Sequence, residues 1–438
     1  MRRSLIWLLV GILTILSACI TPVEESNETA VLPTATPQPA NTPLPQTTPD
    51  LSTDAVTPTS TTQTFIIWIP PDLITRSENG ARLLNDQLSL ALANHPELQI
   101  RIEQKSISGQ GGMLSYLRTG RNVAPNIMPD LVILRTDQLA AAAADSLIYP
   151  VDSLLEPLLF EDLYPAAYGL VHSETSLLGY PFALTGLSHL SYNSTIITDT
   201  LPSTWTQFTA VSGPTMTFPA AGRDGALLGL RLYISAGGTL VNEAGQPDLQ
   251  PEPLTQALEQ INSARQSGFI LAQSSTLTTL AESWQMFQNG SATIVATTSD
   301  QVLQNQVDEQ SIGFAPIPGI NNRVTPFVSG WAWCITSPDP AKQAIGAEVI
   351  TFLSSDVNLA EWSYQTYLLP ARRSAMHLWP QESAYVRFIQ RELELAQAFP
   401  ITANSTILNA IGNAVFDVVS LTKSPQVAAE EAVATLQQ

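Results

Sequence analysis

The sequence predicts an α/β protein built as two domains, and three observations carry this prediction. The chain has 438 residues, which is too long for one compact core. Hydrophobic residues make up 44% of it, enough to fill a globular interior. Short apolar runs rich in β-forming residues alternate with stretches of helical periodicity. This alternation is typical of a parallel sheet covered by helices.

The first elements of the folded region alternate regularly. The predicted strands are TFIIWI (64–69), LQIRIEQ (98–104) and DLVIL (130–134). Between the first two strands, four leucines recur at helical spacing, and His95-Pro96 ends the helix. The run MLSYLRTG (113–120) predicts a short helix capped by Gly120.

The later chain repeats the pattern less regularly. TMTFPA (215–220) and ATIVAT (292–297) are predicted strands. PLTQALEQINSARQSGF (253–269) and AESWQMFQNG (281–290) are predicted helices, each ending near a glycine. Residues 381–438 carry three amphipathic helices, and Ser424-Pro425 opens the last of them.

The charge and the reactive residues narrow the class of function. The formal net charge is −19, so phosphate backbones repel the chain and we expect no nucleic-acid partner. The two cysteines are far apart and predict no disulfide framework. The four histidines lack the paired spacing of metal ligands, and no G-x-S-x-G nucleophile motif occurs. We therefore expect no catalysis, no metal and no cofactor.

The start of the chain has the pattern of a secretory signal. Arg2 and Arg3 precede an apolar run over residues 5–16, and this run is too short for a typical spanning helix. The following LSAC resembles the cleavage box of bacterial lipoproteins. That resemblance implies a signal peptide over 1–18 and a lipid on Cys19, hence an extracytoplasmic protein anchored to the cell membrane. A plain secretory signal or a simple membrane anchor remains the alternative. Residues 19–63, rich in Pro and Thr, predict an extended tether.

Seven segments, taken in order, are similar to one family. They are ALANHPELQIRI, MPDLVIL, GYPFALTGLSHLSYNSTII, FQNGSATIVAT, IGFAPIPG, PFVSGWAWCITS and LLPARRSAM. Together they resemble the extracellular solute-binding proteins of ABC importers, family 1, the maltose-binding-protein-like group.

The resemblance implies a two-lobed, periplasmic-binding-protein-like fold of type II. Each lobe is then an α/β sandwich, three hinge crossings join the lobes, and the ligand binds in the cleft between them. Both lobes are discontinuous: we place lobe one at 64–180 plus 319–366 and lobe two at 181–318 plus 367–438. The implied partners are a small solute, above all a carbohydrate, and the subunits of an ABC permease. We expect a monomer.

Aromatic side chains carry the strongest prediction of a binding site. The flat rings of tryptophan stack on the C–H faces of sugars, and SGWAWC places two tryptophans on one predicted strand. Gly330 leaves room for a close approach of the backbone to a ligand. We expect Trp331 to contact the ligand from a position that faces solvent in the open form. Trp333 and Cys334 are expected to be buried in the core.

The other candidate ligand residues depend on the resemblance for their placement. Trp68 ends the first strand at the expected rim, Tyr180 begins a crossover, and Ser108, like Ser106, offers a hydroxyl beside the cleft. Asp300 ends the strand ATIVATTSD, where the family often has an aromatic residue. Arg372 lies in the third crossing, either as a donor to the ligand or in a hinge salt bridge.

Several functions remain open at this point. The first is capture of an uncharged solute, above all an oligosaccharide, for an ABC permease. The same fold also suits a peptide, a polyamine or a sugar phosphate. A surface lipoprotein for sensing or adhesion would need no permease. A surface glycoside hydrolase would need two carboxylates about 5–9.5 Å apart.

Overall fold

The structure, a computed structural model, describes residues 63–109 and 111–436. The predicted signal peptide, Cys19 and nearly all of the tether lie outside these residues. Within the described chain, no helix is both long and apolar enough to cross a membrane.

The larger of two sheets has seven strands in the order β10-β4-β9-β3-β1-β2, with β11 paired to β9. Its strands are β1 (Gln63–Ile69), β2 (Leu98–Gln104), β3 (Leu131–Arg135), β4 (Tyr180–Thr185), β9 (Phe327–Ile335), β10 (Leu369–Pro370) and β11 (Gln397–Ala398). β1 pairs in parallel with β2 and β3, whereas β9 runs antiparallel to both β3 and β4. The predicted parallel sheet is therefore wrong in one respect: the sheet is mixed, because β9 inserts between β3 and β4 from the opposite direction.

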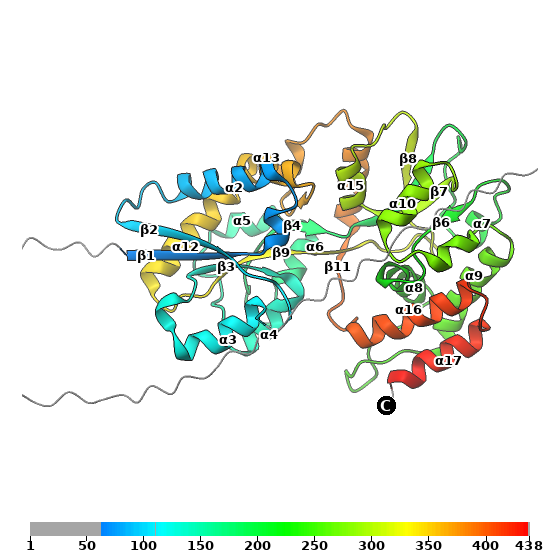
Figure 1. The fold of residues 1–438 in the computed structure, drawn as a ribbon, viewed down its shortest axis with the longest axis horizontal. Helices are drawn as coiled ribbons and strands as arrows, with labels where there is room; N and C mark the ends of the chain where they lie inside the picture. Colours follow the sequence, from blue (N-terminus) through cyan, green and yellow to red (C-terminus); the bar gives the residue numbers. More distant parts are fainter. Residues whose placement is uncertain (1–62, 110, 437–438) are drawn as a thin grey trace, which may run out of the picture. The chain divides into compact units, whose positions relative to one another are not determined.

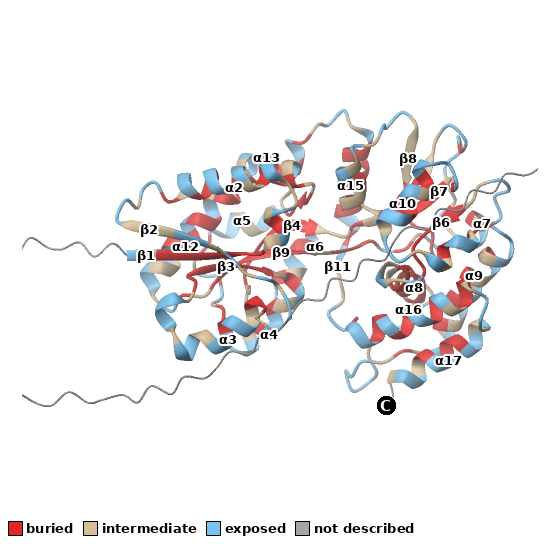
Figure 2. Cartoon of the chain, in the orientation of Figure 1, coloured by how far each residue is buried: buried red, intermediate tan, exposed pale blue. Residues whose placement is uncertain are grey.

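Helices cover both faces of the larger sheet, with α2 and α13 above it and α3 and α4 below it in Figure 1. Strands β1 and β9 are buried along most of their length, whereas the edge strand β2 is largely open (Figure 2). In this part of the chain the helices are α1 (Pro71–Ile74), α2 (Glu78–Ala91), α3 (Met113–Val123), α4 (Leu139–Ala144), α5 (Pro157–Glu161), α6 (Pro165–Val171), α12 (Pro340–Leu353), α13 (Asp356–Thr366) and α14 (Arg373–His377).

The smaller sheet has four strands in the order β6-β7-β5-β8. They are β5 (Ser188–Asn193), β6 (Met216–Thr217), β7 (Ile294–Thr298) and β8 (Ile312–Ala315). The helices of this part are α7 (Trp205–Thr209), α8 (Arg223–Ser235), α9 (Pro251–Gln266), α10 (Leu280–Gln288), α11 (Ser299–Asn305), α15 (Ala384–Leu395), α16 (Ser405–Val419) and α17 (Pro425–Leu436). Aromatic rings of α15 pack on His189 of β5 and Phe314 of β8. Helices α8, α9, α16 and α17 pack against one another around a second hydrophobic core.

Most predicted elements form where the pattern placed them, for identifiable reasons. The hydroxyl of Ser77 accepts the Gly80 N–H and starts α2, which ends before His95-Pro96. A capping box of Thr279 and Glu282 starts α10. Helix α17 begins at Pro425, as predicted.

Two predicted boundaries are wrong. Gly120 does not cap α3 but lies inside it, where it makes room for Met128, because a Cβ at this position would collide with the methionine side chain. The predicted strand 215–220 is reduced to Met216–Thr217. Pro219 has no N–H to donate to a ladder, which ends the pairing early.

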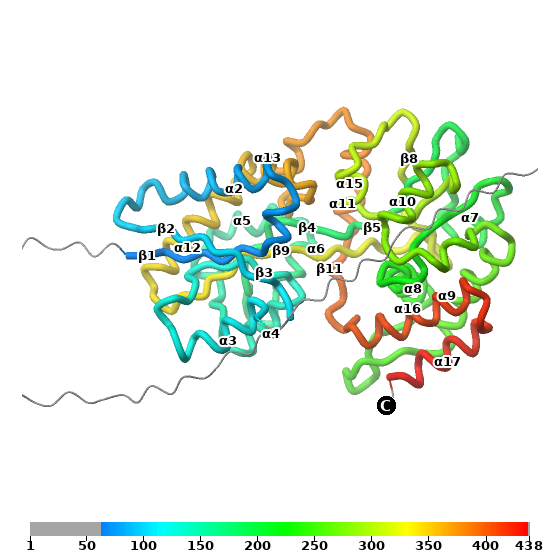
Figure 3. Tube along the Cα trace, viewed as in Figure 1, coloured from blue at the N-terminus to red at the C-terminus, as the bar shows by residue number. Residues whose placement is uncertain are grey.

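The chain passes between the two sheets three times. The first two passages follow β4 and β8, and the third follows α14 and runs through α15 and β11 to α16. Figure 3 shows β9 returning beside β3 and β4 from much later in the sequence. The sequence assigned residues 181–185 and 369–370 to lobe two. They belong to the larger sheet, because β4 pairs with β9 and β10 pairs with β4.

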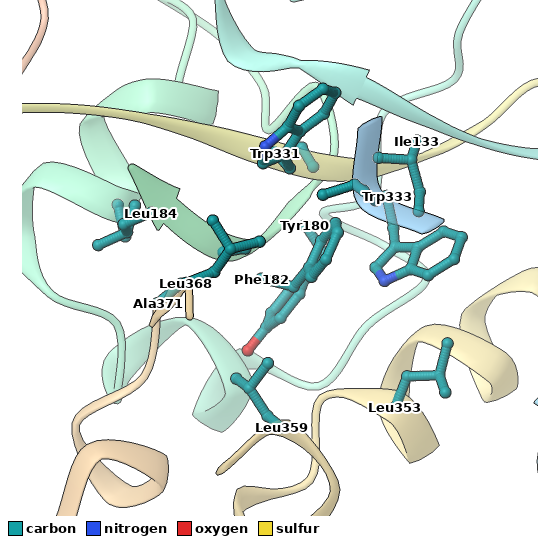
Figure 4. Close-up of a cluster of buried hydrophobic side chains, with 14 of the residues drawn as sticks. Ile133, Tyr180, Phe182, Leu184, Trp331, Trp333, Leu353, Leu359, Leu368 and Ala371 are labelled. Carbon is teal, nitrogen blue, oxygen red and sulfur yellow. The ribbon is translucent and has the colours of Figure 1, made fainter. Parts of the chain in front are cut away.

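The core of the larger sheet contains the predicted core residues of β9. Trp333 is 1% exposed and Cys334 is fully buried, which confirms both predictions. Phe182 packs on Trp333 and on Trp362, with ring centroids 5.3 and 5.2 Å apart. Figure 4 shows Trp333 beside Ile133, its register partner on β3. Burial raises the pKa of the Cys334 thiol.

Candidate functional site

Three adjoining pockets form a cleft where the parallel strands of the larger sheet end. All three pockets are lined by Arg135 and Arg223, and their volumes are about 430, 560 and 580 Å³. Arg135 is the last residue of β3, Asp72 follows the end of β1, and Ser108 follows the end of β2. The carboxyl ends of parallel strands are the usual place for ligands in α/β sheets. We call these three pockets together the cleft.

Both sheets contribute to the 430 Å³ pocket of the cleft. Asp72, Arg76, Arg135 and Trp331 come from the part of the chain around the larger sheet. From around the smaller sheet come residues of α8, the end of β7 and the start of α11, namely Arg223, Asp224, Leu227, Arg231, Thr298 and Asp300. A solute bound here would therefore touch both parts at once.

An ion pair joins the two parts at this pocket. Arg76 Nη2 lies 2.8 Å from Asp300 Oδ1, and its Nε donates to the Thr366 carbonyl. The second oxygen of Asp300 accepts the N–H of Gly186, in the first passage between the sheets. Burial raises the pKa of Asp300, and the Arg76 charge opposes that shift. Asp300 thus lines the cleft as predicted, but both of its oxygens already accept hydrogen bonds from the protein.

Trp331 and Gly330 also line this pocket. Trp331 is only 8% exposed, so the expectation that it faces solvent is wrong. Its ring is packed against the protein and exposes little surface to the pocket. A Cβ at Gly330 would come within 2.5 Å of the Ala183 carbonyl oxygen, on the neighbouring strand β4. The glycine is therefore required by strand packing, whatever it allows a ligand to do.

The remaining predicted residues divide into one at the cleft and three elsewhere. Ser108, together with Ser106, lines the 580 Å³ pocket. Trp68 is 2% exposed, with Lys105 Nζ 5.1 Å from its ring centroid, and so it is covered rather than open at a rim. Tyr180 is fully buried and donates its hydroxyl to the Leu159 carbonyl.

Arg372 forms the salt bridge that was its alternative role. Its Nε lies 2.8 Å from Asp162 Oδ2, and it also bonds the Ser354 carbonyl. Nothing in these contacts turns the side chain toward the cleft.

The charged residues of α8 were not predicted from the sequence. Arg223, Leu227 and Arg231 recur at a spacing of four and line one pocket, so one face of α8 looks into the cleft. Arg231 is 5% exposed, and burial lowers its pKa to about 10, while the charge of Asp224 opposes the shift. Burial raises the pKa of Asp224. The only local signal is the run GRDG at 222–225, and short runs of this composition are common in ordinary turns.

The described residues contain no group of three or more His, Cys, Asp or Glu side chains placed to hold a metal ion. The cleft instead combines guanidinium, carboxylate and hydroxyl groups with apolar walls from Leu73, Trp331 and Phe399. Such a lining suits reversible binding of a polar solute.

Solved structures with the same fold are numerous. The sugar-binding protein MalE of Xanthomonas citri superposes with a TM-score of 0.69 at 19% identity, over 86% of this chain and 98% of that one. A cyclic alpha-maltosyl-1,6-maltose binding protein from Arthrobacter globiformis gives 0.66 at 15% identity, over 85% and 97%. A cyclo/maltodextrin-binding protein complexed with maltotetraose gives 0.65 at 16%, over 85% and 96%. These likenesses confirm the predicted two-lobed α/β fold.

No curated protein sequence matches this chain significantly. A family profile does match: residues 110–384 fit the bacterial extracellular solute-binding proteins. This match covers more than half of the chain and includes all four strands of the smaller sheet, four strands of the larger sheet and the passages after β4 and β8. The chain therefore belongs to the family of bacterial extracellular solute-binding proteins.

Proposed function

We propose that this protein captures a carbohydrate in the cleft and delivers it to an ABC permease. The observation that carries the proposal is the lining of the cleft. Charged and hydroxyl side chains alternate there with the apolar walls of Trp331 and Phe399. Sugars need both: hydrogen-bonding partners for their hydroxyls and apolar surface for their C–H faces.

The structural relatives support the carbohydrate class. Those named above bind cyclic maltosyl-maltose and maltotetraose, and a further relative, the GacH receptor of Streptomyces glaucescens, was solved with acarbose. At 15–19% identity these proteins share the fold with this chain, and the ligand class is our inference.

The experiment is a thermal-shift screen of the secreted form against neutral and charged saccharides, peptides and polyamines. A saccharide at 100 times its Kd should stabilise the protein by about 2.7 kcal/mol. Arg135→Gln, in the cleft, should reduce the shift, whereas Arg121→Gln, in a pocket at the opposite end of the larger sheet, should not. Stabilisation by peptides or polyamines alone would contradict the proposal.

Membrane anchoring is part of the same proposal and rests on LSAC at residues 16–19. Replacing Cys19 with Ala should abolish labelling by a lipid precursor and release the protein from the membrane fraction. If the variant stays with the membrane, the apolar segment itself is the anchor. Uptake of a confirmed ligand by cells that carry the permease separates transport from a sensing or adhesive role.

A further inference from the structure

The cationic side chains of the cleft are unusual for this chain. The protein has 38 acidic and 19 basic residues, yet the 430 Å³ pocket is lined by four arginines and three aspartates. The arginines are Arg76, Arg135, Arg223 and Arg231, and the aspartates are Asp72, Asp224 and Asp300. This pocket thus has one more basic than acidic side chain, on a protein whose acidic residues outnumber the basic ones two to one.

Two of these arginines already have partners. Arg76 is paired with Asp300 at 2.8 Å. Arg135 Nη2 lies 2.8 Å from Oδ2 of Asp137, which lines the two neighbouring pockets. The arginines of α8 differ: among the residues described, neither Arg223 nor Arg231 lies within 4.0 Å of a carboxylate oxygen.

Arg231 has the stronger need of a partner. It is 5% exposed, its Nη1 donates to the Leu227 carbonyl, and its Nε has no partner in the described part of the chain. A buried, charged group that lacks a full set of hydrogen bonds destabilises a fold. Asp224 and Asp72, which also line the pocket, form no ion pair with Arg231. Burial raises the pKa of Asp224, and a hydrogen bond from the Leu280 N–H opposes that shift. Asp72 is exposed on α1.

The amino end of α8 adds a partial positive charge beside these two arginines. Arg223 and Asp224 are its first residues and line the pocket, whereas the N–H groups of the next two residues already donate to the Gly222 carbonyl. The residue before them, Gly222, cannot carry a capping side chain, since a Cβ there would collide with the Thr278 carbonyl oxygen. The helix end and both guanidinium groups therefore favour a ligand with anionic oxygen atoms.

We propose that the captured saccharide carries an anionic oxygen group, a carboxylate or a phosphate ester, which Arg223 and Arg231 bind at the amino end of α8. This inference rests on the proposed function and replaces the uncharged oligosaccharide expected from the sequence. The guanidinium plane pairs with two oxygens of either group.

The test compares ligands that differ only in charge. Calorimetric titration is carried out with a neutral oligosaccharide, the same oligosaccharide ending in a uronic acid, and the corresponding sugar phosphate. At least one acidic form should bind about tenfold tighter than the neutral one or better. Arg223→Gln should remove most of that preference, so that the acidic and neutral forms bind the variant with similar affinities. Arg391→Gln, an exposed arginine of α15 outside the cleft pockets, is the matched control and should change neither affinity.

A second variant separates binding from folding. Arg231→Met removes a buried charge without a full set of partners, so the unliganded protein should melt at the same or a higher temperature while the acidic preference falls. If the protein binds the neutral and acidic forms equally, and Arg223→Gln does not change their relative affinities, the inference is overturned and the proposed function stays intact. Failure of every saccharide to bind, with peptides or polyamines binding instead, would overturn both.

Discussion

The two ends of the larger sheet both carry a pocket, and the contrast between them separates structure from function. At the amino ends of β1 and β3 lies a pocket of about 560 Å³, lined by Gln63, Asp130 and Lys342 among others. At the carboxyl ends lies the cleft, whose pockets are of similar size. Volume therefore does not distinguish a structural end from a binding end.

The buried charges of the two ends do differ. At the amino end, Asp130 accepts the Ile66 N–H at 2.9 Å and binds Lys342 Nζ at 3.0 Å, while Lys342 also donates to the Thr64 carbonyl. These contacts are complete within the protein and tie β1 and β3 to α12. At the cleft, Arg231 is as deeply buried as Asp130 but lacks a carboxylate partner in the described chain. The two ends therefore differ in whether the buried charge is paired within the protein, and not in the space available.

The largest expected effect lies on β9, which joins the two ends. Trp333→Ala should lower the free energy of unfolding by about 3–5 kcal/mol, because this indole is fully packed. Trp331→Ala should weaken binding of a confirmed ligand by about 2 kcal/mol or more. Since Trp331 is itself mostly buried, it should also lower stability, by less than Trp333→Ala. Chemical denaturation and titration of both variants check this. Early melting of Trp331→Ala with normal binding would remove Trp331 from the site.

His189 is a useful comparison with Arg231, because it is also buried with one nitrogen unpartnered among the described residues but can lose its charge. His189 is fully buried in β5 among Phe314, Tyr385 and Phe388, and its Nε2 has no partner in the described chain. Burial lowers its pKa from 6.5 to about 4, so it is neutral at pH 7, whereas Arg231 with a pKa of about 10 stays charged.

Between pH 6.5 and 4 the unfolded chain binds a proton at His189 that the folded protein does not. Stability should therefore fall by roughly 3 kcal/mol from this residue as the pH drops through that range. His189→Phe should flatten this part of a pH series of denaturant melts, since a phenyl ring suits the aromatic surroundings. A variant with the same slope as the parent protein would show that other groups cause it.

At the amino end, Lys342→Met should reduce stability by about 1.5–3 kcal/mol, because Asp130 stays buried without its cation. Binding in the cleft should not change. Arg135→Gln is the counterpart at the other end, and it should weaken binding with little change in melting. Loss of binding in Lys342→Met, measured at a temperature where the variant is fully folded, would mean that the two ends are coupled.

The smallest expected effect concerns Ser108, whose hydroxyl lines the cleft without a described partner in the protein. Ser108→Ala should weaken binding by about 0.5–1.5 kcal/mol, the usual value of one neutral hydrogen bond. The melting temperature should be unchanged. Isothermal titration resolves a change of this size, and unaltered affinity would exclude Ser108 from the site.

The sequence predicted elements whose signals are local and missed features that depend on distant partners. β1, α2 and β2 follow from periodicity and from His95-Pro96. Gly120 lies against the side chain of Met128, a contact that the local pattern does not reveal. The antiparallel insertion of β9 between β3 and β4 leaves no periodic pattern in any of the three strands.

The candidate site was harder to predict for a related reason. Trp68 and Tyr180 carry the aromatic signal of a ligand site, but neighbouring elements cover them. Arg223 and Arg231 carry no such signal, since a spacing of four on a helix is common to exposed and buried faces. Only the fold brings them to the carboxyl end of β3.

The central position of β9 also has a consequence for biosynthesis. β3 and β4 are both made long before residues 327–335, and each lacks a neighbour until that segment emerges. The larger sheet therefore cannot close before most of the smaller sheet has been synthesised. Any nascent or truncated chain that stops short of residue 327 presents open strand edges, which recruit other chains into aggregates. We expect premature folding before export to be harmful, and holdase chaperones to be most important while the chain is between residues 185 and 335.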